Sequence, residues 1–288
     1  MEKIMQKYSL AVDEQQIAAK VEEAKQAAKN INPEALKQCF NSIDLTTLNA
    51  TDTISQVKKM AEKVSAFSNV YHNLPNVAAI CVYPALVSTV RKNLTDKNVN
   101  IASVTAGFPA SQTFVDVKIK ESLLAVENGA DEVDIVISVG RFLEKDYEFV
   151  FSEIEQIKKA VGDTHVKVIL ETGALKDLQL IRIASLLAME GGADFIKTST
   201  GKFYDAATPE AVCVMCQAIA DYKVQSGRSV GIKPSGGIST TDEALVYYNI
   251  LKLTLGDEWL NNKLFRIGAS RLANNLLTDL VGLEAKYF

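Results

Sequence analysis

The sequence predicts an α/β fold of the (β/α)₈ barrel (TIM barrel) type, with a helical extension at the N-terminus. Eight short apolar, β-rich runs recur along the 288 residues, and their starts are spaced by 22 to 36 residues. Segments with the hydrophobic period of amphipathic helices separate these runs, a pattern typical of βαβ units and a parallel sheet. No GxGxxG motif follows the first run, which disfavours a dinucleotide-binding doubly wound sheet.

A helix is predicted before the first strand. Asp13 is placed as its N-cap and Gln16 follows three residues later, which resembles a capping box at the start of residues 14–30. The N-terminal stretch is too short and too polar to enclose a core of its own. We therefore expect a helical extension over residues 1–41 and a single barrel domain over residues 42–288.

Asn32 and Pro33 mark the start of a second helix, as its N-cap and first helical position. Strands and helices alternate after it, and several of the helical segments end at a glycine, as helices often do. The predicted strands cover residues 43–47, 77–84, 99–107, 132–138, 166–172, 194–200, 230–236 and 264–270.

The composition disfavours several classes of protein. The net charge is −4 and the isoelectric point is near 5.4, which argues against nucleic acid or an anionic membrane as a partner. No apolar run approaches the roughly 20 residues that span a bilayer, and residues 1–12 lack the apolar core of a signal peptide. Four cysteines in a chain of this length do not make a disulfide framework, so we expect a cytoplasmic protein.

Polar side chains gather at the C-terminal ends of the predicted strands, where barrels of this type carry their chemistry. We expect these side chains to surround one active site. They are Asp44, Thr46, Cys81, Tyr83, Asp134, Glu171, Thr172, Lys197, Ser199, Thr200, Lys233 and Ser235.

Lys197 and Lys233 stand on adjacent predicted strands among apolar residues. Side-chain alternation would point both toward the barrel interior. Burial and like charge both lower the pKa of a lysine, and a neutral amine can form a Schiff base with a carbonyl. Alternatively, each lysine reaches the barrel rim or pairs with Asp134 or Glu171. The presence of two such lysines favours Schiff-base chemistry, in which Asp134 neutralises a lysine or transfers protons.

Three glycine-containing turns follow the last three predicted strands, at residues 198–202, 233–239 and 267–271. Such turns, with a helix N-terminus beyond them, commonly bind phosphate in barrels of this type. The hydroxyl of Thr200 and the ammonium of Lys202 can add polar contacts. The three turns together predict a phosphorylated small-molecule ligand.

Metal-dependent chemistry is disfavoured by the residue types available. Only two histidines are present, His72 and His165, and neither stands at the C-terminal end of a predicted strand. Metal-dependent aldolases and catalytic triads both need placed histidines. Cys213 and Cys216 form a CxxC, but within a helical segment and without a second ligand pair. We therefore expect a lysine nucleophile and an enzyme without a metal.

Six motifs together resemble the deoxyribose-phosphate aldolase family, in the family's order and over roughly residues 40–275. They are "IDLTTLN", "AAICVYP", "EVDIVI", "VKVILETG", "DFIKTSTGK" and "GIKPSGGI". The resemblance implies a lyase, a class I aldolase without a cofactor. Such an enzyme reversibly cleaves 2-deoxy-D-ribose 5-phosphate to acetaldehyde and D-glyceraldehyde 3-phosphate, as part of carbohydrate degradation.

The resemblance also implies individual roles. Lys197 would be the Schiff-base lysine, Lys233 the neighbour that lowers its pKa, and Asp134 the proton-relay carboxylate. The positions that match residues near the substrate are Asp44, Thr46 and Cys81. The positions that match the phosphate pocket are Gly201, Lys202, Gly236, Gly237, Gly268 and Ser270.

This chain departs from the family pattern in places. Ser239 stands where bacterial members often have a basic residue, and we expect Arg271 to supply the charge instead. A C-terminal tyrosine reaches the active site in some relatives, so Tyr287 is a candidate for that role. The extension could cap the barrel, cover helices or form a subunit contact. Both a homodimer and a homotetramer stay open.

Two other functions agree with the same residues. The first is another Schiff-base barrel enzyme, such as a transaldolase or a keto-acid aldolase, which would not release acetaldehyde. The second is a barrel that binds sugar phosphates without catalysis, which predicts that no covalent adduct forms on Lys197.

Overall fold

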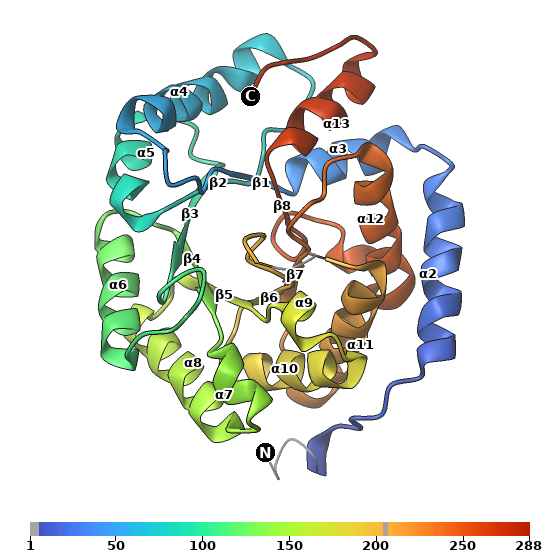
Figure 1. Ribbon diagram of the computed structural model, residues 1–288. Coiled ribbons are helices and arrows are strands. Elements are labelled where there is room, and N and C mark those ends of the chain that lie inside the picture. The colour runs from blue at the N-terminus through green and yellow to red at the C-terminus, as the bar shows by residue number, and fades with distance from the viewer. Residues whose placement is uncertain (1–5, 204–206) are drawn as a thin grey trace.

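The computed structural model describes residues 6–203 and 207–288 and confirms the (β/α)₈ barrel (Figure 1). Eight parallel strands lie in the order β7-β6-β5-β4-β3-β2-β1-β8, and bridges between Ile232 and Phe265 and between Ser235 and Gly268 link β7 to β8. The strands are β1 (Ile43–Thr46), β2 (Ala79–Val82), β3 (Asn100–Thr105), β4 (Glu132–Val136), β5 (His165–Ile169), β6 (Phe195–Lys197), β7 (Gly231–Lys233) and β8 (Ile267–Ala269).

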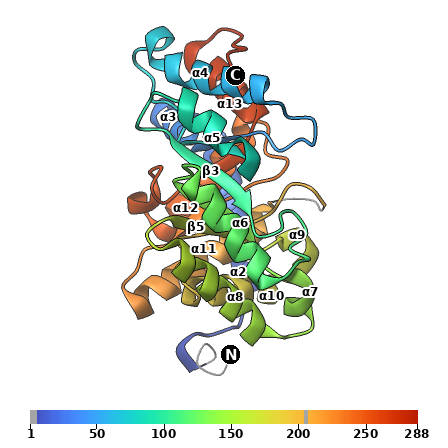
Figure 2. The same cartoon turned by 90° about the vertical axis from the view of Figure 1, so that its left-hand side faces the viewer.

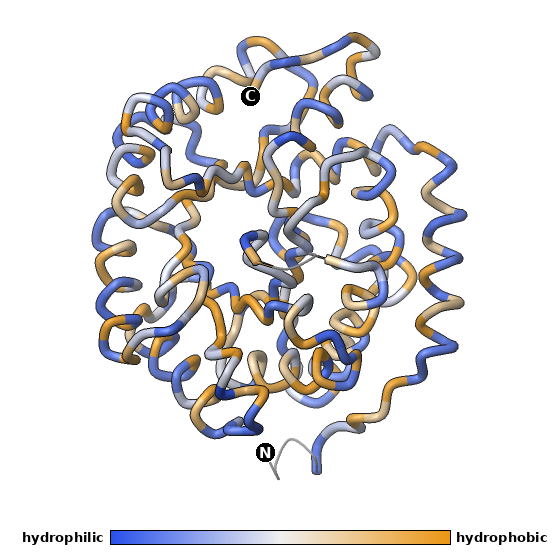
Figure 3. The backbone as a smooth tube through the Cα atoms, in the orientation of Figure 1, coloured by the Kyte–Doolittle hydropathy of each residue, from blue (hydrophilic) through white to orange (hydrophobic). Residues whose placement is uncertain are grey.

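Helices surround the barrel, and from the side α6 and α8 lie in front of β3 and β5 (Figure 2). Their amphipathic character appears as alternating hydrophilic and hydrophobic residues along the tube in Figure 3. The helices are α2 (Glu14–Ala28), α3 (Pro33–Asn41), α4 (Ile54–Val70), α5 (Val87–Asn93), α6 (Val115–Glu127), α7 (Val139–Leu143), α8 (Tyr147–Val161), α9 (Thr172–Leu175), α10 (Leu178–Glu190), α11 (Pro209–Ser226), α12 (Thr241–Leu255) and α13 (Arg271–Val281), with short 3₁₀ turns at η1 (Pro84–Leu86) and η2 (Asp257–Trp259).

All eight predicted strands are present, but each ends one to three residues earlier than predicted, and β5, β6 and β7 end three residues earlier. β6 ends at Lys197 and β7 at Lys233, so residues 198–200 and 234–236 belong to loops. The hydroxyl of Thr198 accepts a hydrogen bond from the Ser235 backbone N–H at 3.0 Å and donates to the Ser235 carbonyl at 3.1 Å. This side-chain bonding replaces the regular ladder of the sheet, because threonine can bond the backbone in place of a neighbouring strand.

The N-terminal helices pack on the outside of the barrel. The Asp13 carboxylate accepts the Gln16 backbone N–H at 3.0 Å and so caps α2 as the sequence predicts. Ile17 and Val21 are buried on the face of α2 that packs against α11 and α12, and α3 packs against α12 and α13 (Figure 1). Of the three roles left open for the extension, the structure shows that it covers helices.

The structure also bears on the CxxC pair, on metal binding and on membrane-spanning helices. Cys213 and Cys216 are free and buried in α11. Within residues 6–203 and 207–288, no group of three or more His, Cys, Asp or Glu side chains is arranged to hold a metal ion. No helix in the described part of the chain combines the length and the apolar character that a membrane crossing requires.

Gly231 on β7 makes room for the Phe195 ring, which comes from the neighbouring strand β6. A Cβ atom on Gly231 would lie 2.2 Å from Cε1 of Phe195, whose ring is 1% exposed. The Phe195 ring in turn lies under charged neighbours, with Nζ of Lys167 5.9 Å and Cζ of Arg266 5.7 Å from its centroid. A residue without a side chain is therefore required opposite Phe195.

We predict that Gly231→Ala destabilises the protein by about 1–3 kcal/mol, because the added methyl group forces Phe195 out of its position. Thermal or denaturant unfolding measures the change. Gly140→Ala is the matched control: it lies in α7, and its new Cβ would meet only Nε2 of Gln112 at 3.7 Å. The control should be neutral or slightly stabilising. Equal stability of the two variants would contradict the packing argument.

Candidate active site

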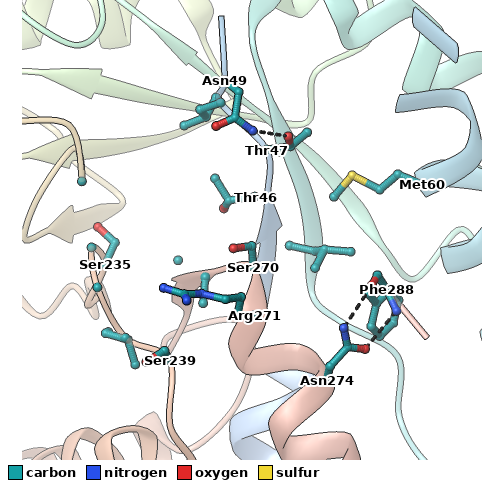
Figure 4. Close-up of a pocket in the computed structure, with 18 of the residues that line it drawn as sticks. Thr46, Thr47, Asn49, Met60, Ser235, Ser239, Ser270, Arg271, Asn274 and Phe288 are labelled. Carbon is teal, nitrogen blue, oxygen red and sulfur yellow. Dashed lines mark hydrogen bonds between the residues drawn. The ribbon is translucent and has the colours of Figure 1, made fainter. Parts of the chain in front are cut away.

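A pocket of about 640 Å³ opens at the C-terminal ends of β1, β6, β7 and β8 (Figure 4). Lys197 lines it from β6 and is only 3% exposed. Thr46 from β1 and Ser235 from the loop after β7 line the pocket as well. The position agrees with the rule that barrels of this type carry their active sites at this end.

Asp134 joins the two predicted lysines. Its Oδ2 atom accepts hydrogen bonds from Nζ of Lys197 at 2.8 Å and from Nζ of Lys233 at 2.7 Å. Its Oδ1 atom accepts from Nζ of Lys167 at 3.0 Å. The three residues that the sequence singles out for catalysis therefore meet at one buried carboxylate, together with a lysine on β5 that the sequence analysis did not single out.

A second layer of charge lies deeper in the barrel. Arg266 donates from Nη1 to Oδ1 of Asp44 at 2.7 Å and from Nη2 to Oε1 of Glu132 at 2.8 Å. Lys167 also donates to Glu132, and Lys233 pairs with Asp44. Each of these three cations thus has a carboxylate below the level of Asp134, because burying a charge is costly unless a partner is present.

The charges of the ion-paired network around Asp134 do not balance when all are ionised. The network consists of three carboxylates and four cations, each at most 4% exposed. They are Asp44, Glu132, Asp134, Lys167, Lys197, Lys233 and Arg266. One positive charge is therefore in excess, and Lys197 is the cation whose only carboxylate partner, Asp134, is shared with two other lysines.

Burial lowers the pKa of Lys197, and the charge of Lys233 lowers it further; the opposing attraction of Asp134 is not enough to restore it. Burial also acts to lower the pKa of Lys233, but Asp134 and Asp44 outweigh it and the pKa is raised. The pKa of Lys167 is likewise raised by its carboxylates. Lys197 is thus the lysine of this cluster that can most readily supply a neutral amine.

The remaining residues predicted near the substrate divide into two groups. Thr46 and Thr200 line the pocket, and the Thr200 hydroxyl donates to Oε2 of Glu171 at 2.6 Å. Asp44 and Cys81 are fully buried and lie outside the pocket lining. Asp44 acts on the site through Lys233 and Arg266, and burial raises the pKa of the Cys81 thiol.

The residues predicted to bind phosphate all line the same pocket. Gly201, Gly236 and Gly237 adopt positive φ angles of 72°, 92° and 78°, which glycine reaches without strain. The other members are Lys202, Gly268, Ser270 and Arg271. Ser270 and Arg271 stand at the start of α13, where free backbone N–H groups and the helix dipole favour an anion.

The C-terminal residues take positions that the sequence left open. The Tyr287 hydroxyl donates to the Lys63 carbonyl at 2.7 Å, and its ring packs against Phe67 and Tyr71. Tyr287 is outside the pocket lining, whereas Phe288 lines the pocket, held by hydrogen bonds to the Asn274 side chain (Figure 4).

Comparison with known proteins gives the family. A model of the DeoC/LacD family of aldolases matches residues 39–247, which include β1 to β7. The chain belongs to this aldolase family. Deoxyribose-phosphate aldolase of Homo sapiens is 41% identical to it over 251 residues, which cover 84% of this chain and 79% of the human protein. The Mus musculus enzyme of that name is 42% identical with the same coverage.

Solved structures agree with the fold of this aldolase. The structure of the tetrameric deoxyribose phosphate aldolase from Aeropyrum pernix matches it with a TM-score of 0.68 and 24% identity. That match covers 89% of this chain and 96% of the other. At this identity the likeness concerns the barrel itself.

We predict that Lys233→Leu raises the pKa of Lys197, because a like charge is removed and Asp134 is shared among fewer lysines. A neutral amine is present above its pKa, so the acidic limb of the pH profile of aldolase kcat/KM should move to higher pH. Activity at neutral pH should fall about 100-fold or more.

Lys233→Arg is the matched control because it keeps the positive charge at this position. Its acidic limb should stay close to that of the wild type even where the altered geometry reduces the rate. Circular dichroism verifies that both variants are folded. An unshifted limb in Lys233→Leu would show that Lys233 does not set the pKa of Lys197.

Proposed function

We propose that this aldolase cleaves 2-deoxy-D-ribose 5-phosphate reversibly to acetaldehyde and D-glyceraldehyde 3-phosphate, with Lys197 as the Schiff-base residue. The observation that carries the proposal is a buried lysine of lowered pKa in a pocket that also contains three glycine-rich turns. The human and mouse relatives named deoxyribose-phosphate aldolase align over most of the chain.

Lys197 begins the reaction as a neutral amine. Its Nζ attacks the C1 aldehyde of the open-chain sugar to give a carbinolamine. A proton from solvent on the carbinolamine hydroxyl then allows water to leave, and an iminium ion remains. Lys233 and Lys167 stay protonated, since their pKa values are raised, and they hold Asp134 in place. The amine thus reacts beside charged groups that do not compete for the aldehyde.

Asp134 is the group positioned to move protons during cleavage. Its Oδ2 atom lies 2.8 Å from Nζ of Lys197, which is the atom that becomes the imine nitrogen. A proton leaves the C3 hydroxyl, the C2–C3 bond breaks, and its electron pair moves into the iminium to form an enamine. Glyceraldehyde 3-phosphate departs, the enamine is protonated at C2, and hydrolysis releases acetaldehyde and Lys197.

The phosphate is expected on the glycine turns, remote from the reacting carbon. Gly236 and Gly237 follow β7, and Ser270 and Arg271 begin α13, so backbone N–H groups and a guanidinium lie on one side of the pocket. Ser239 also lines this side and offers no charge, which leaves Arg271 and Lys202 as the basic groups expected there. Anchoring the phosphate orients the sugar carbonyl toward Lys197.

The expected cellular location, assembly and partners are part of the same proposal. We expect a cytoplasmic enzyme, and its four cysteines are all free and buried. Assembly as a homodimer or homotetramer stays a prediction, and the Aeropyrum pernix relative is described as tetrameric. The expected partner is the phosphosugar itself, without nucleic acid, membrane or cofactor.

Borohydride trapping tests the Schiff base. Incubation with 2-deoxyribose 5-phosphate and sodium borohydride should attach a reduced substrate or acetaldehyde fragment to Lys197, detected by peptide mass spectrometry. Lys197→Met should take up no label, and the same protein without borohydride is the second control. Label on Lys233 alone, or no label at all, would favour a different enzyme or a non-catalytic binding protein.

Arg271→Gln tests the phosphate side of the pocket. We expect KM for 2-deoxyribose 5-phosphate to rise about tenfold while kcat changes little, because the lost contact holds the unreactive end of the sugar. Arg141→Gln removes an exposed guanidinium on α7 that is paired with Asp146 and lies outside the pocket. The control should leave KM close to the wild-type value, and an equal rise in both variants would count against a specific role of Arg271.

A further inference from the structure

The pocket has a second cationic wall, opposite the glycine turns. Helix α4 contributes Gln56, Lys59, Met60 and Lys63 to the pocket lining. In Figure 4, Met60 lies on one side of Thr46, whereas Ser239 and the Arg271 side chain lie on the other. The α4 wall and the glycine turns therefore face the pocket from two sides.

The charged residues of α4 fall into two groups, those that line the pocket and those that do not. Lys58 pairs with Glu62 at 3.7 Å, and neither residue lines the pocket. Lys59 and Lys63, one helical turn apart, do line it, and within the described chain neither makes an ion pair. Their spacing places both ammonium groups on one face of the helix.

The pocket lining carries an excess of positive charge. Besides Lys197, which is neutral in the proposed reaction, four of the described side chains that line it are cationic and none is a carboxylate, although the net charge of the chain is −4. Lys202 and Arg271 provide two positive charges beside the glycine turns, about the amount that one phosphate monoester neutralises. Lys59 and Lys63 remain as a second pair.

We propose that Lys59 and Lys63 form a second anion subsite, so that the pocket binds sugar bisphosphates with one phosphate on the glycine turns and the other against α4. The volume of about 640 Å³ leaves room for both ends of such a ligand. An aldopentose 1,5-bisphosphate carries its second phosphate on C1, in place of a free aldehyde, and so presents no carbonyl to Lys197. It therefore acts as a competitive inhibitor. The proposal rests on the proposed function for the first phosphate subsite.

Two ligands that differ by one phosphate test this proposal. Ribitol 5-phosphate and ribitol 1,5-bisphosphate have no carbonyl, so neither can react with Lys197. Isothermal titration calorimetry should show the bisphosphate binding about tenfold more tightly than the monophosphate. The same ratio is expected for the inhibition constants against cleavage of 2-deoxyribose 5-phosphate. The preference should shrink at about 1 M salt, where the Debye length is about 3 Å.

The double variant Lys59→Gln/Lys63→Gln should reduce the preference to about twofold or less and leave monophosphate binding nearly the same. Lys58→Gln/Lys92→Gln is the control: it removes the same total charge from α4 and α5 but none from the pocket lining. The control should retain the preference.

Four results would overturn the proposal. Equal affinity of the wild type for both ligands, or a preference that survives in Lys59→Gln/Lys63→Gln, would place no second phosphate on α4. An equal loss of the preference in Lys58→Gln/Lys92→Gln would indicate that the preference depends only on the net charge of the protein. An equal weakening of both ligands in the α4 variant would assign these lysines to the first phosphate. Calorimetry gives these answers even if cleavage of 2-deoxyribose 5-phosphate is not observed, so the two proposals fail separately.

Discussion

The ion pairs that converge on Asp134 constrain the whole interior of this barrel. A fully buried carboxylate needs cations, and adjacent strands supply three lysines that all reach it. Two of these lysines have further carboxylates deeper in the barrel, and Lys197 does not. The cation that lacks a partner of its own is thus the one that lines the pocket. When Lys197 is neutral, the three carboxylates Asp44, Glu132 and Asp134 are balanced by the three cations Lys167, Lys233 and Arg266.

The same charge balance would affect the intermediate of the proposed reaction. An iminium ion on Lys197 would return a positive charge to a network that is balanced without it, and carbon–carbon cleavage would remove that charge by forming the enamine. In the proposed reaction the buried network would therefore favour the neutral amine before substrate binds and the neutral enamine after cleavage, although its side chains below Asp134 do not line the pocket.

The sequence predicts the fold, and it also points to the proposed catalytic centre, because both depend on local pattern. Continuous apolar runs mark all eight strands, and Lys197, Lys233 and Asp134 stand out because each is a charge within such a run. Lys167 and Arg266 are also charges within predicted strands, but they stand near the N-terminal ends of those strands, away from the expected active site. The alternation of side chains could have found Arg266, since it precedes Gly268 by two residues and so belongs to the same face of the strand.

Other features depend on geometry that a single sequence does not specify. Asp134 pairs with Lys167 because β4 and β5 align these two residues in register. The pocket wall on α4 depends on how that helix turns toward the strand ends, so Lys59 and Lys63 look like ordinary surface lysines in the sequence. The packing of α2 against α11 and α12 covers the outer faces of these two helices. In any assembly of copies of this aldolase, α2 therefore already occupies the surface that a second subunit would need for direct contact with those faces.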